Sequence, residues 1–201
     1  GPISPLIQLN ESELLALVDY VHSQTEIFNA VNGSALLQAY YGDKLLSGVT
    51  QVFSTALHSA ITKLSEHQYF GLKDVVTYKG VKLTSYSGPF RKAALEAAVG
   101  NGKLIAFPQV LSATRDPMRS YAVAKHDQGY SLECEILMAR GVDADPFHDT
   151  ETMGEWEVIG PAGQKFVVTD KQQTGFSDPN RGGISVIDRY VLKPAHYDPA
   201  V

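Results

Sequence analysis

The sequence predicts an α+β fold, with a helical N-terminal lobe and a β-rich core that is mostly antiparallel. Apolar residues recur at helical spacing in the first third of the chain, most clearly over residues 47–65. From about residue 74 the pattern changes to short apolar runs separated by turn residues, which is typical of strands. These runs do not alternate regularly with helices, so a doubly wound parallel sheet is not expected. We expect one domain over residues 1–201, with the helical lobe at about 1–73 and the core at about 74–201.

The helical lobe is expected to start at Asn10, because Asn10 and Glu13 have the spacing of a capping box. A second helix is expected over residues 34–41 and a third over residues 47–65. The third has a stripe of apolar residues at i, i+3, i+4 and i+7, formed by Val49, Val52, Phe53, Ala56, Leu57, Ala60, Ile61 and Leu64.

The β-rich core is expected to contain five strand segments and two short helices. The strands are predicted at residues 75–79, 104–110, 130–138, 158–168 (with a turn at 160–163) and 184–192. The helices are predicted at residues 89–99 and 116–125, the second with Asp116 as its N-cap and Pro117 as its first residue.

Composition excludes several classes of protein. The 201 residues carry a net charge of −5, which disfavours a protein that mainly binds phosphate backbones. The single cysteine, Cys134, rules out an internal disulfide or a cysteine-rich zinc site, and its place in an expected strand predicts a buried, inert thiol. No apolar run approaches the roughly 18 residues that a membrane helix needs, and no signal peptide is visible.

Several common catalytic motifs are absent from the sequence. There is no P-loop, no complete dinucleotide-binding fingerprint at residues 100–102 and no nucleophile elbow. The histidines have no metal-ligand spacing, so no metal is expected, and each histidine is predicted to be a surface or packing residue. They are His22, His58, His67, His126, His148 and His196.

Three short segments stand out instead, at residues 77–80, 111–114 and 155–158. In the third, Glu155 and Glu157 lie on one face of an extended chain, because side chains alternate with a period of two. The same spacing recurs elsewhere in this chain, so the pair alone predicts only a solvated face.

The surroundings of Glu155 and Glu157 favour chemistry. The pair follows a loop over residues 141–154 that is rich in Asp, Gly, Thr and His, and it comes directly before a strand–turn–strand segment. Acidic residues that end such a loop at the mouth of a sheet are typical of functional sites.

In this order the three segments resemble the arginine-type mono-ADP-ribosyltransferases, the "R-S-E" group of toxins and related enzymes. That family has aromatic-Arg-Gly on its first core strand, Ser-Thr-Ser on a second, and Glu-x-Glu after a mobile loop. Residues 154–166 resemble the family's final hairpin, and Asp19-Tyr20 and residues 28–32 resemble its helical lobe. The resemblance covers most of residues 14–170 and implies a split β-sandwich core.

The resemblance implies that NAD is the substrate and that its nicotinamide–ribose bond breaks. Glu157 would stabilise the positive charge that develops on the ribose, and Ser112 would hold Glu157. Glu155 would activate the acceptor, which the family pattern predicts to be a protein arginine.

The resemblance also assigns NAD-binding and target-binding residues. Lys79 would neutralise the NAD phosphates, while Tyr78 and Gly80 would flank the nicotinamide, with Ser112 and Thr114 beside it. Phe147 and Met153, in the loop before the glutamates, are expected to contact the target protein. Trp156 points away from both glutamates along an extended chain, so packing is its expected role.

Two departures from the family pattern keep alternatives open. Ala113 and Thr114 replace the second and third residues of Ser-Thr-Ser, and Lys79 stands where the family has arginine, which loses the bidentate contacts of a guanidinium. A non-catalytic NAD-binding relative and a transferase acting on nucleic acid are therefore alternatives. A two-carboxylate glycoside hydrolase built on Glu155 and Glu157 is a further one.

The resemblance also predicts a biological setting. It implies a secreted or injected toxin or effector that acts on a protein in the cytoplasm of a target cell, and it leaves room for an immunity protein in the producer. A chain with one cysteine suits such a reducing compartment.

Overall fold

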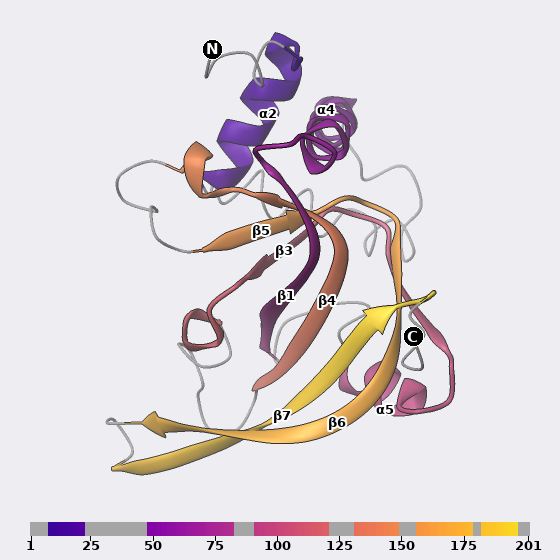
Figure 1. Cartoon of the computed structure of the whole chain (residues 1–201), viewed down its shortest axis with the longest axis vertical. Helices are drawn as coiled ribbons and strands as arrows, with labels where there is room; N and C mark the ends of the chain where they lie inside the picture. The colour runs from indigo at the N-terminus through magenta and orange to yellow at the C-terminus, as the bar shows by residue number, and fades with distance from the viewer. Residues whose placement is uncertain are drawn as a thin grey trace. The chain divides into compact units, whose positions relative to one another are not determined.

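The computed structural model describes residues 8–22, 48–82, 91–120, 131–148, 156–178 and 182–196 (Figure 1). Helices and a mostly antiparallel sheet make up this part of the chain, which confirms the predicted α+β class. The expected helix at residues 34–41 and the segment 28–32 lie outside the described residues. In the described part, no helix is long and apolar enough to cross a membrane.

The described helices and strands follow one another along the chain. The helices are α2 (Glu11–Val21), α4 (Gly48–Ser65) and α5 (Lys92–Ala98), with the 3₁₀ turns η3 (Pro117–Arg119) and η4 (Asp145–Phe147). The strands are β1 (Gly71–Lys82), β2 (Leu104–Phe107), β3 (Leu111–Thr114), β4 (Ser131–Asp143), β5 (Glu157–Gly160), β6 (Gln164–Asp178) and β7 (Gly183–Pro194). They are hydrogen-bonded in the order β1-β3-β5-β4-β7-β6-β2.

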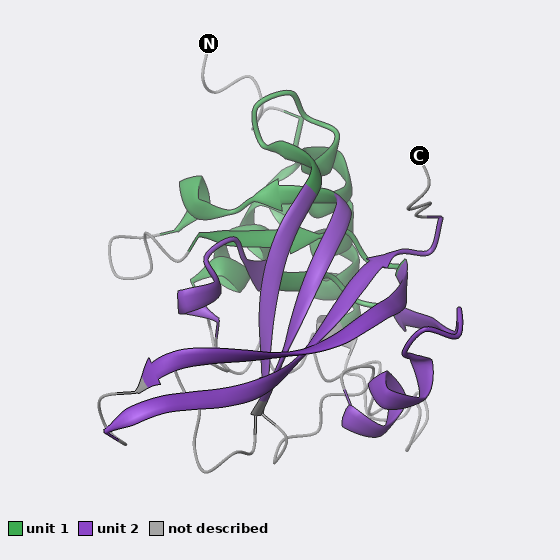
Figure 2. Ribbon diagram, turned by 60° about the horizontal axis from the view of Figure 1, so that its bottom comes forward, with its two compact units in different colours: residues 1–74, 107–112, 140–164 green, residues 75–106, 113–139, 165–201 purple. Residues whose placement is uncertain are grey.

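The pairing is antiparallel for β1–β3, β4–β5 and β6–β7, and parallel for β4–β7. The chain divides into two compact units, drawn in green and purple in Figure 2. Unit 1 comprises residues 1–74, 107–112 and 140–164, and unit 2 comprises residues 75–106, 113–139 and 165–201.

The first helix of unit 1 begins at the predicted capping box. The Glu13 N–H donates to Asn10 Oδ1 at 2.8 Å, and the Asn10 N–H donates back to Glu13 Oε1 at 2.9 Å. This exchange satisfies two N–H groups that a helix start otherwise leaves unpaired. Glu13 also accepts from Ser59 Oγ at 2.7 Å and from Lys63 Nζ at 2.8 Å, so one buried carboxylate ties α2 to α4.

The hydrophobic core of unit 1 forms where α2 and α4 pack on strand residues of the same unit. Its buried members are Leu9, Ala16, Leu17, Tyr20, Val21, Leu57, Ala60, Ile61, Leu64, Val110, Val142, Ala144 and Ile159. Most of the predicted stripe of α4 therefore faces this core. Val52 does not: its side chain is exposed, because it lies at the margin of the face that α4 turns to α2.

Unit 2 is built around a long β-ribbon. Strands β6 and β7 pair from Phe166↔Pro194 to Asp178↔Gly183, with an irregularity between Val168 and Asp170. Strand β7 also pairs in parallel with β4, where Glu133 lies opposite Arg189. These strands are longer than the apolar runs predicted, because the ribbon continues through polar residues that the hydrophobic pattern did not mark.

Two predicted elements of the core differ from the structure. The strand expected over residues 104–110 ends at Phe107, because Pro108 has no N–H to give to a ladder. In the described part of the helix expected over residues 116–125, the structure has a single 3₁₀ turn, η3, and residues 121–125 lie outside the described residues. Asp116 caps this turn, but Ser120 already has extended angles of φ −54° and ψ 137°.

The network around Glu13 predicts a pH-dependent contribution to stability. Burial acts to raise the pKa of Glu13, but the hydrogen bonds from Lys63, Asn10 and Ser59 outweigh it, and the pKa lies below its ordinary value. The network therefore stabilises the fold fully above the ordinary glutamate pKa of about 4.3, and this stabilisation is lost as the pH falls through the lower folded-state value.

Glu13→Gln is expected to destabilise the protein by about 1–2 kcal/mol at pH 7. The difference from wild type should shrink toward zero near pH 3, as measured by urea unfolding across the pH range. Glu11→Gln, two residues earlier on the same helix and exposed, is the matched control and should show neither effect. A difference for Glu13→Gln that stays constant down to pH 3 would contradict this account.

Candidate active site

Glu157 is the first residue of β5, and its backbone is fixed on both sides. Strand β5 pairs with the end of β4, with Val142 opposite Ile159. The Ala144 N–H donates to the Glu157 carbonyl at 3.0 Å, and the Glu157 N–H donates to Asp145 Oδ1 at 3.2 Å. The position of the Glu157 carboxylate is therefore set by a strand pair and by a 3₁₀ turn.

The two oxygens of the Glu157 carboxylate have different partners. Ser112 Oγ donates a short hydrogen bond to Oε2, and His148 Nε2 lies 2.8 Å from Oε1. Ser112 reaches this place because alternation along β3 buries Leu111 and Ala113 on one face and turns Ser112 to the other. The Glu157 side chain is only 12% exposed, so these contacts replace much of its hydration.

The structure thus brings Ser112 and Glu157 together within unit 1. It adds His148, which the sequence reasoning treated as a surface or packing residue. The His148 side chain is 1% exposed and faces Glu157. Metal-ligand spacing was the only signal applied to the histidines; nearness to the Glu-x-Glu pair along the chain was the signal that would have selected this one.

Residues 141–148, the described part of the predicted loop over residues 141–154, have regular structure. Strand β4 continues to Asp143, and η4 follows directly. Phe147 packs its ring against Phe70 with centroids 5.2 Å apart and belongs to the margin of the unit 1 core. The predicted target contact of Phe147 stays a prediction.

Trp156 differs from its predicted packing role. Its side chain is 47% exposed, and its backbone is left-handed with φ +55°. Alternation does not hold there, because a left-handed residue breaks the extended chain just before β5 begins. This conformation is unusual for a bulky residue and costs about 1–2 kcal/mol.

The predicted NAD-binding residues Tyr78, Lys79, Gly80 and Thr114 lie in unit 2, on β1 and β3. Tyr78 pairs with Thr114 across the two strands. The guanidinium of Arg189 lies over the Tyr78 ring, 5.3 Å from its centroid. Burial raises the pKa of the Tyr78 hydroxyl, and the negative charge of Glu135 adds to this effect.

Two buried groups accompany these residues in unit 2. Glu133 is fully buried and accepts from Arg189 Nε at 2.7 Å and from Nη2 at 2.6 Å, both on Oε1. Cys134 is a buried free thiol, as predicted, and burial raises its pKa well above the usual range although the positive charge of Lys79 opposes the shift. Such a thiol is not a nucleophile near neutral pH.

Two predicted site residues, Glu155 and Met153, lie outside the described residues. Among the residues that are described, no group of three or more His, Cys, Asp and Glu side chains is placed to hold a metal ion.

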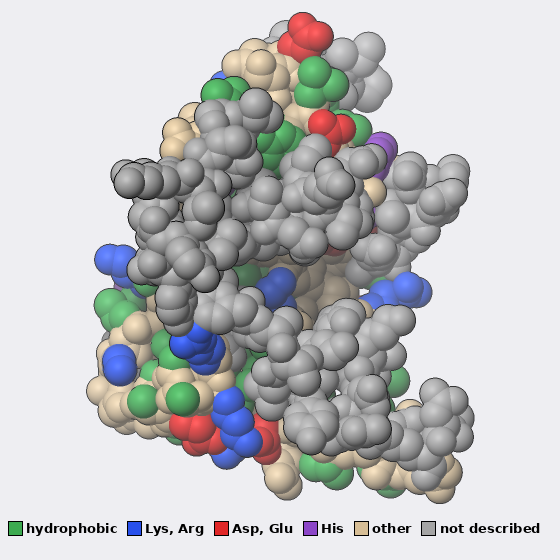
Figure 3. Space-filling view, turned by 180° about the vertical axis from the view of Figure 1, so that it is seen from behind, with side chains coloured by type: hydrophobic (Ala, Val, Ile, Leu, Met, Phe, Trp, Pro, Cys, Tyr) green, Lys and Arg blue, Asp and Glu red, His purple; other side chains and the backbone are tan. Residues whose placement is uncertain are grey.

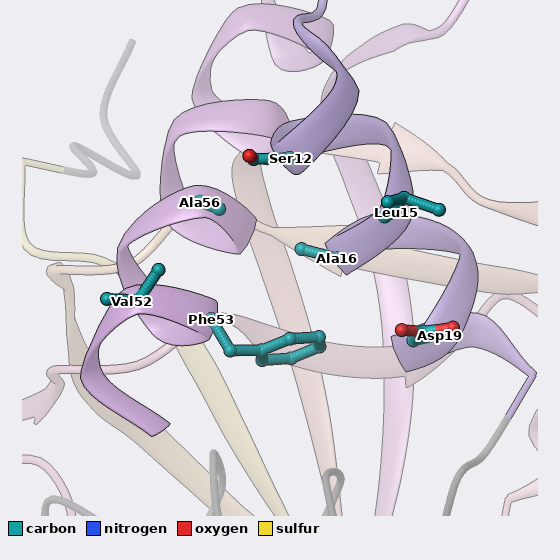
Figure 4. Close-up of a pocket in the computed structure, with 7 residues that line it drawn as sticks. All are labelled: Ser12, Leu15, Ala16, Asp19, Val52, Phe53 and Ala56. Atoms are coloured by element: carbon teal, nitrogen blue, oxygen red, sulfur yellow. The ribbon is translucent and has the colours of Figure 1, made fainter. Parts of the chain in front are cut away.

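A groove of about 600 Å³ lies between α2 and α4 (Figure 4). Its walls are mostly apolar, with Leu15 and Val52 exposed at its rim and Phe53 between the helices. It holds none of the residues predicted for catalysis or NAD binding, so the carboxylate at Glu157 is the better candidate for a reaction centre.

Comparison with known proteins gives matches only at the level of structure. No family model matches the chain, and no curated protein does. BECa, an ADP-ribosylating toxin of a binary enterotoxin of C. perfringens solved with NADH, matches with 17% identity and a TM-score of 0.62. The match covers 94% of this chain and 45% of BECa. The chain therefore spans less than half the length of that toxin.

Two other solved structures are similar over most of both chains. The ADP-ribosyltransferase Vis of Vibrio splendidus is 14% identical with a TM-score of 0.63, over 98% of this chain and 78% of Vis. Exoenzyme S of Pseudomonas aeruginosa, solved with carba-NAD, is 16% identical with a TM-score of 0.55, over 96% of this chain and 81% of that one. The chain has the fold of the bacterial ADP-ribosyltransferase toxins, as its motifs predicted.

The left-handed backbone at Trp156 predicts that a glycine variant is more stable than an alanine variant at this position. Trp156→Gly is expected to be more stable than Trp156→Ala by about 1 kcal/mol, because only glycine takes this φ without a Cβ clash. Thermal or urea unfolding measures the difference. Tyr69 is the control, because it is an exposed aromatic residue whose backbone is not left-handed. There the alanine variant should be at least as stable as the glycine variant. A Trp156→Ala variant as stable as Trp156→Gly would contradict the backbone assignment.

Proposed function

We propose that this chain is a mono-ADP-ribosyltransferase that transfers ADP-ribose from NAD to a protein arginine and releases nicotinamide. The observation that carries the proposal is the carboxylate of Glu157, buried at the start of β5 and held by Ser112 and His148. It lies on a fold shared with ADP-ribosyltransferases that bind relatives of NAD, since BECa was solved with NADH and Exoenzyme S with carba-NAD.

The reaction needs a fixed negative charge near the ribose. When the bond between C1′ and the nicotinamide nitrogen breaks, the electron pair leaves with nicotinamide and positive charge spreads over the ribose. An ionised Glu157 that accepts a hydrogen bond from the ribose 2′-hydroxyl stabilises this charge. It stabilises the transition state more than the ground state, because the positive charge is larger there. Burial strengthens the effect because less water screens the carboxylate.

The remaining roles follow the family pattern. Lys79 neutralises the NAD phosphates, and Tyr78 and Gly80 flank the nicotinamide. Thr114, two residues after Ser112, makes a further contact with NAD. Lysine supplies a point charge where arginine would supply two parallel hydrogen bonds, so NAD binding is expected to be weaker than with arginine.

The acceptor is proposed to be a guanidinium. Glu155 would take a proton from the acceptor nitrogen as that nitrogen attacks C1′. Vis has been solved with agmatine, a guanidinium compound, which supports an arginine-like acceptor for this fold. Phe147 and Met153 are the proposed target contacts, and the protein is proposed to act as a secreted or injected effector inside a target cell.

The net charge of −5 supports a protein target over nucleic acid, and two ion pairs on the surface of unit 2 are consistent with it. In unit 2, the surface cations Lys92 and Lys171 are each paired with a carboxylate, of Asp188 and Glu96 respectively. Acidic and basic side chains also adjoin at the lower edge of the face shown in Figure 3. Paired charges of this kind do not build the basic surface that a phosphate backbone requires.

A non-catalytic NAD-binding relative is the second candidate, and the observation that favours it is Lys79 in place of arginine. Calorimetric binding of NAD without release of nicotinamide would support that candidate and exclude the enzyme.

Glu157→Gln is expected to lower nicotinamide release and protein labelling together by at least about 100-fold, because both need the same charge on the ribose. The measurement uses radiolabelled NAD with a protein extract, and mass spectrometry locates the modified residue. Glu11→Gln, which neutralises a surface carboxylate of α2, is the control and should keep full activity. Wild-type protein that neither labels a protein nor releases nicotinamide would refute the proposal.

Glu155→Gln is expected to separate transfer from hydrolysis. Transfer to arginine should fall by about 100-fold, since the acceptor loses its base, while hydrolysis of NAD by water should stay within about threefold of wild type. Agmatine and water serve as alternative acceptors in the same assay. Equal losses in both reactions would show that the two glutamates do not divide the work in this way.

A further inference from the structure

We propose that His148 is a positioning residue for Glu157, a role that rests on the proposed transferase function. The His148 side chain is 1% exposed, and its Nε2 lies 2.8 Å from Glu157 Oε1. The two residues are nine positions apart in the sequence. The contact is therefore made by tertiary structure and is not a consequence of local chain geometry.

The contact completes a two-point hold on the carboxylate. Ser112 donates to Oε2 and His148 reaches Oε1, and the two anchors come from separate elements. An ionised carboxylate can only accept, so Nε2 carries the hydrogen of this bond. Each carboxylate oxygen has a second lone-pair direction, which leaves Glu157 able to accept a ribose hydroxyl while its rotation is blocked.

His148 is itself held firmly enough to serve as an anchor. Its N–H donates to the Asp145 carbonyl at 3.1 Å, and the carbonyl of the preceding Phe147 lies 3.1 Å from His22 Nε2 on the last turn of α2. The Phe147 ring packs on Phe70. These contacts fix His148 against the helical core of unit 1. Its imidazole can therefore restrict the motion of the Glu157 carboxylate.

The orientation of a catalytic group has a large effect on rate. A displacement of about 1 Å at a reacting group can cost about 100-fold. A carboxylate held only by Ser112 is free to turn about its last torsion angle, so removal of the His148 contact is expected to lower kcat. Binding of NAD depends mainly on other groups and should change little.

The test compares His148→Gln with His148→Asn in the complete chain. The amide nitrogen of glutamine can reach the place of Nε2, whereas that of asparagine reaches only the level of Nδ1. We expect His148→Asn to lower kcat for NAD hydrolysis by about 10- to 100-fold with KM for NAD within about twofold, and His148→Gln to recover most of the loss. Unfolding curves for all variants show whether they are folded.

His58→Asn is the matched control. His58 on α4 is a half-buried histidine of unit 1, with Nε2 2.7 Å from Gln109 Oε1, but it contacts no proposed catalytic residue among those described. Its variant should lose stability without a specific loss of kcat. The same pattern in His148→Asn, or equal losses in His148→Gln and His148→Asn, would assign His148 a packing role and overturn the proposal.

The outcomes separate this inference from the proposed function. Wild-type protein without any turnover of NAD would refute the transferase function and this role with it. Wild-type turnover with no difference between the glutamine and asparagine variants would refute only the role of His148. Should His148→Asn fail to fold, a His148→Gln variant with normal kcat supports the role, and a folded His148→Gln variant with kcat reduced 10-fold or more overturns it.

Discussion

The structure of the site depends on one constraint: the partly buried carboxylate of Glu157 needs hydrogen-bond partners. Glu157 loses much of its hydration at the start of β5, and an ionised group in that place is unfavourable unless hydrogen bonds replace the water. Ser112 and His148 supply them to the side chain, while Ala144 and Asp145 fix the backbone. The bonds that compensate for the burial of this carboxylate also fix its orientation, which the proposed catalytic role would require.

The helical part of unit 1 gives these bonds their rigidity. His22, which caps the C-terminus of α2, lies beside the Phe147 carbonyl. Helices α2 and α4 share a core with Val142 and Ile159, which lie opposite each other in the β4–β5 pair that carries Glu157. The buried network at Glu13 joins α4 to the first turn of α2. Packing at some distance from the carboxylate thus sets its position, because close-packed interiors transmit displacements.

Features that depend on neighbouring residues could be predicted from the sequence itself, whereas a tertiary contact could be predicted only where the family resemblance supplied it, as for Ser112 and Glu157. The capping box at Asn10 and Glu13, the stripe of α4 and the strand–turn–strand segment after Glu157 are local patterns, and the structure contains them. The two strands of that segment, β5 and β6, do not pair with each other as a hairpin would, because β5 lies between β3 and β4. The contact between His148 and Glu157 arises only when η4 and β5 are folded together, so nearness along the chain could select His148 as a candidate but could not show the contact.

The misses in the fold have equally specific causes. Helical spacing does not show where a stripe meets its edge, so Val52 was placed in the core although it is exposed. An N-cap and a proline at residues 116–117 are consistent with a long helix, but they equally start the short turn that ends before Ser120. The family resemblance selected the right fold because it used the order of several motifs at once.

The left-handed backbone at Trp156 also has an evolutionary consequence. Glycine adopts that conformation with the least steric strain, and asparagine and aspartate come next. Drift alone would therefore favour these residues in any relative that keeps this turn. The tryptophan of this chain departs from that preference, and its exposed side chain comes one residue before Glu157. An alignment of relatives would therefore separate the two demands: small residues where only the turn is selected, and aromatic ones where the exposed ring is selected as well.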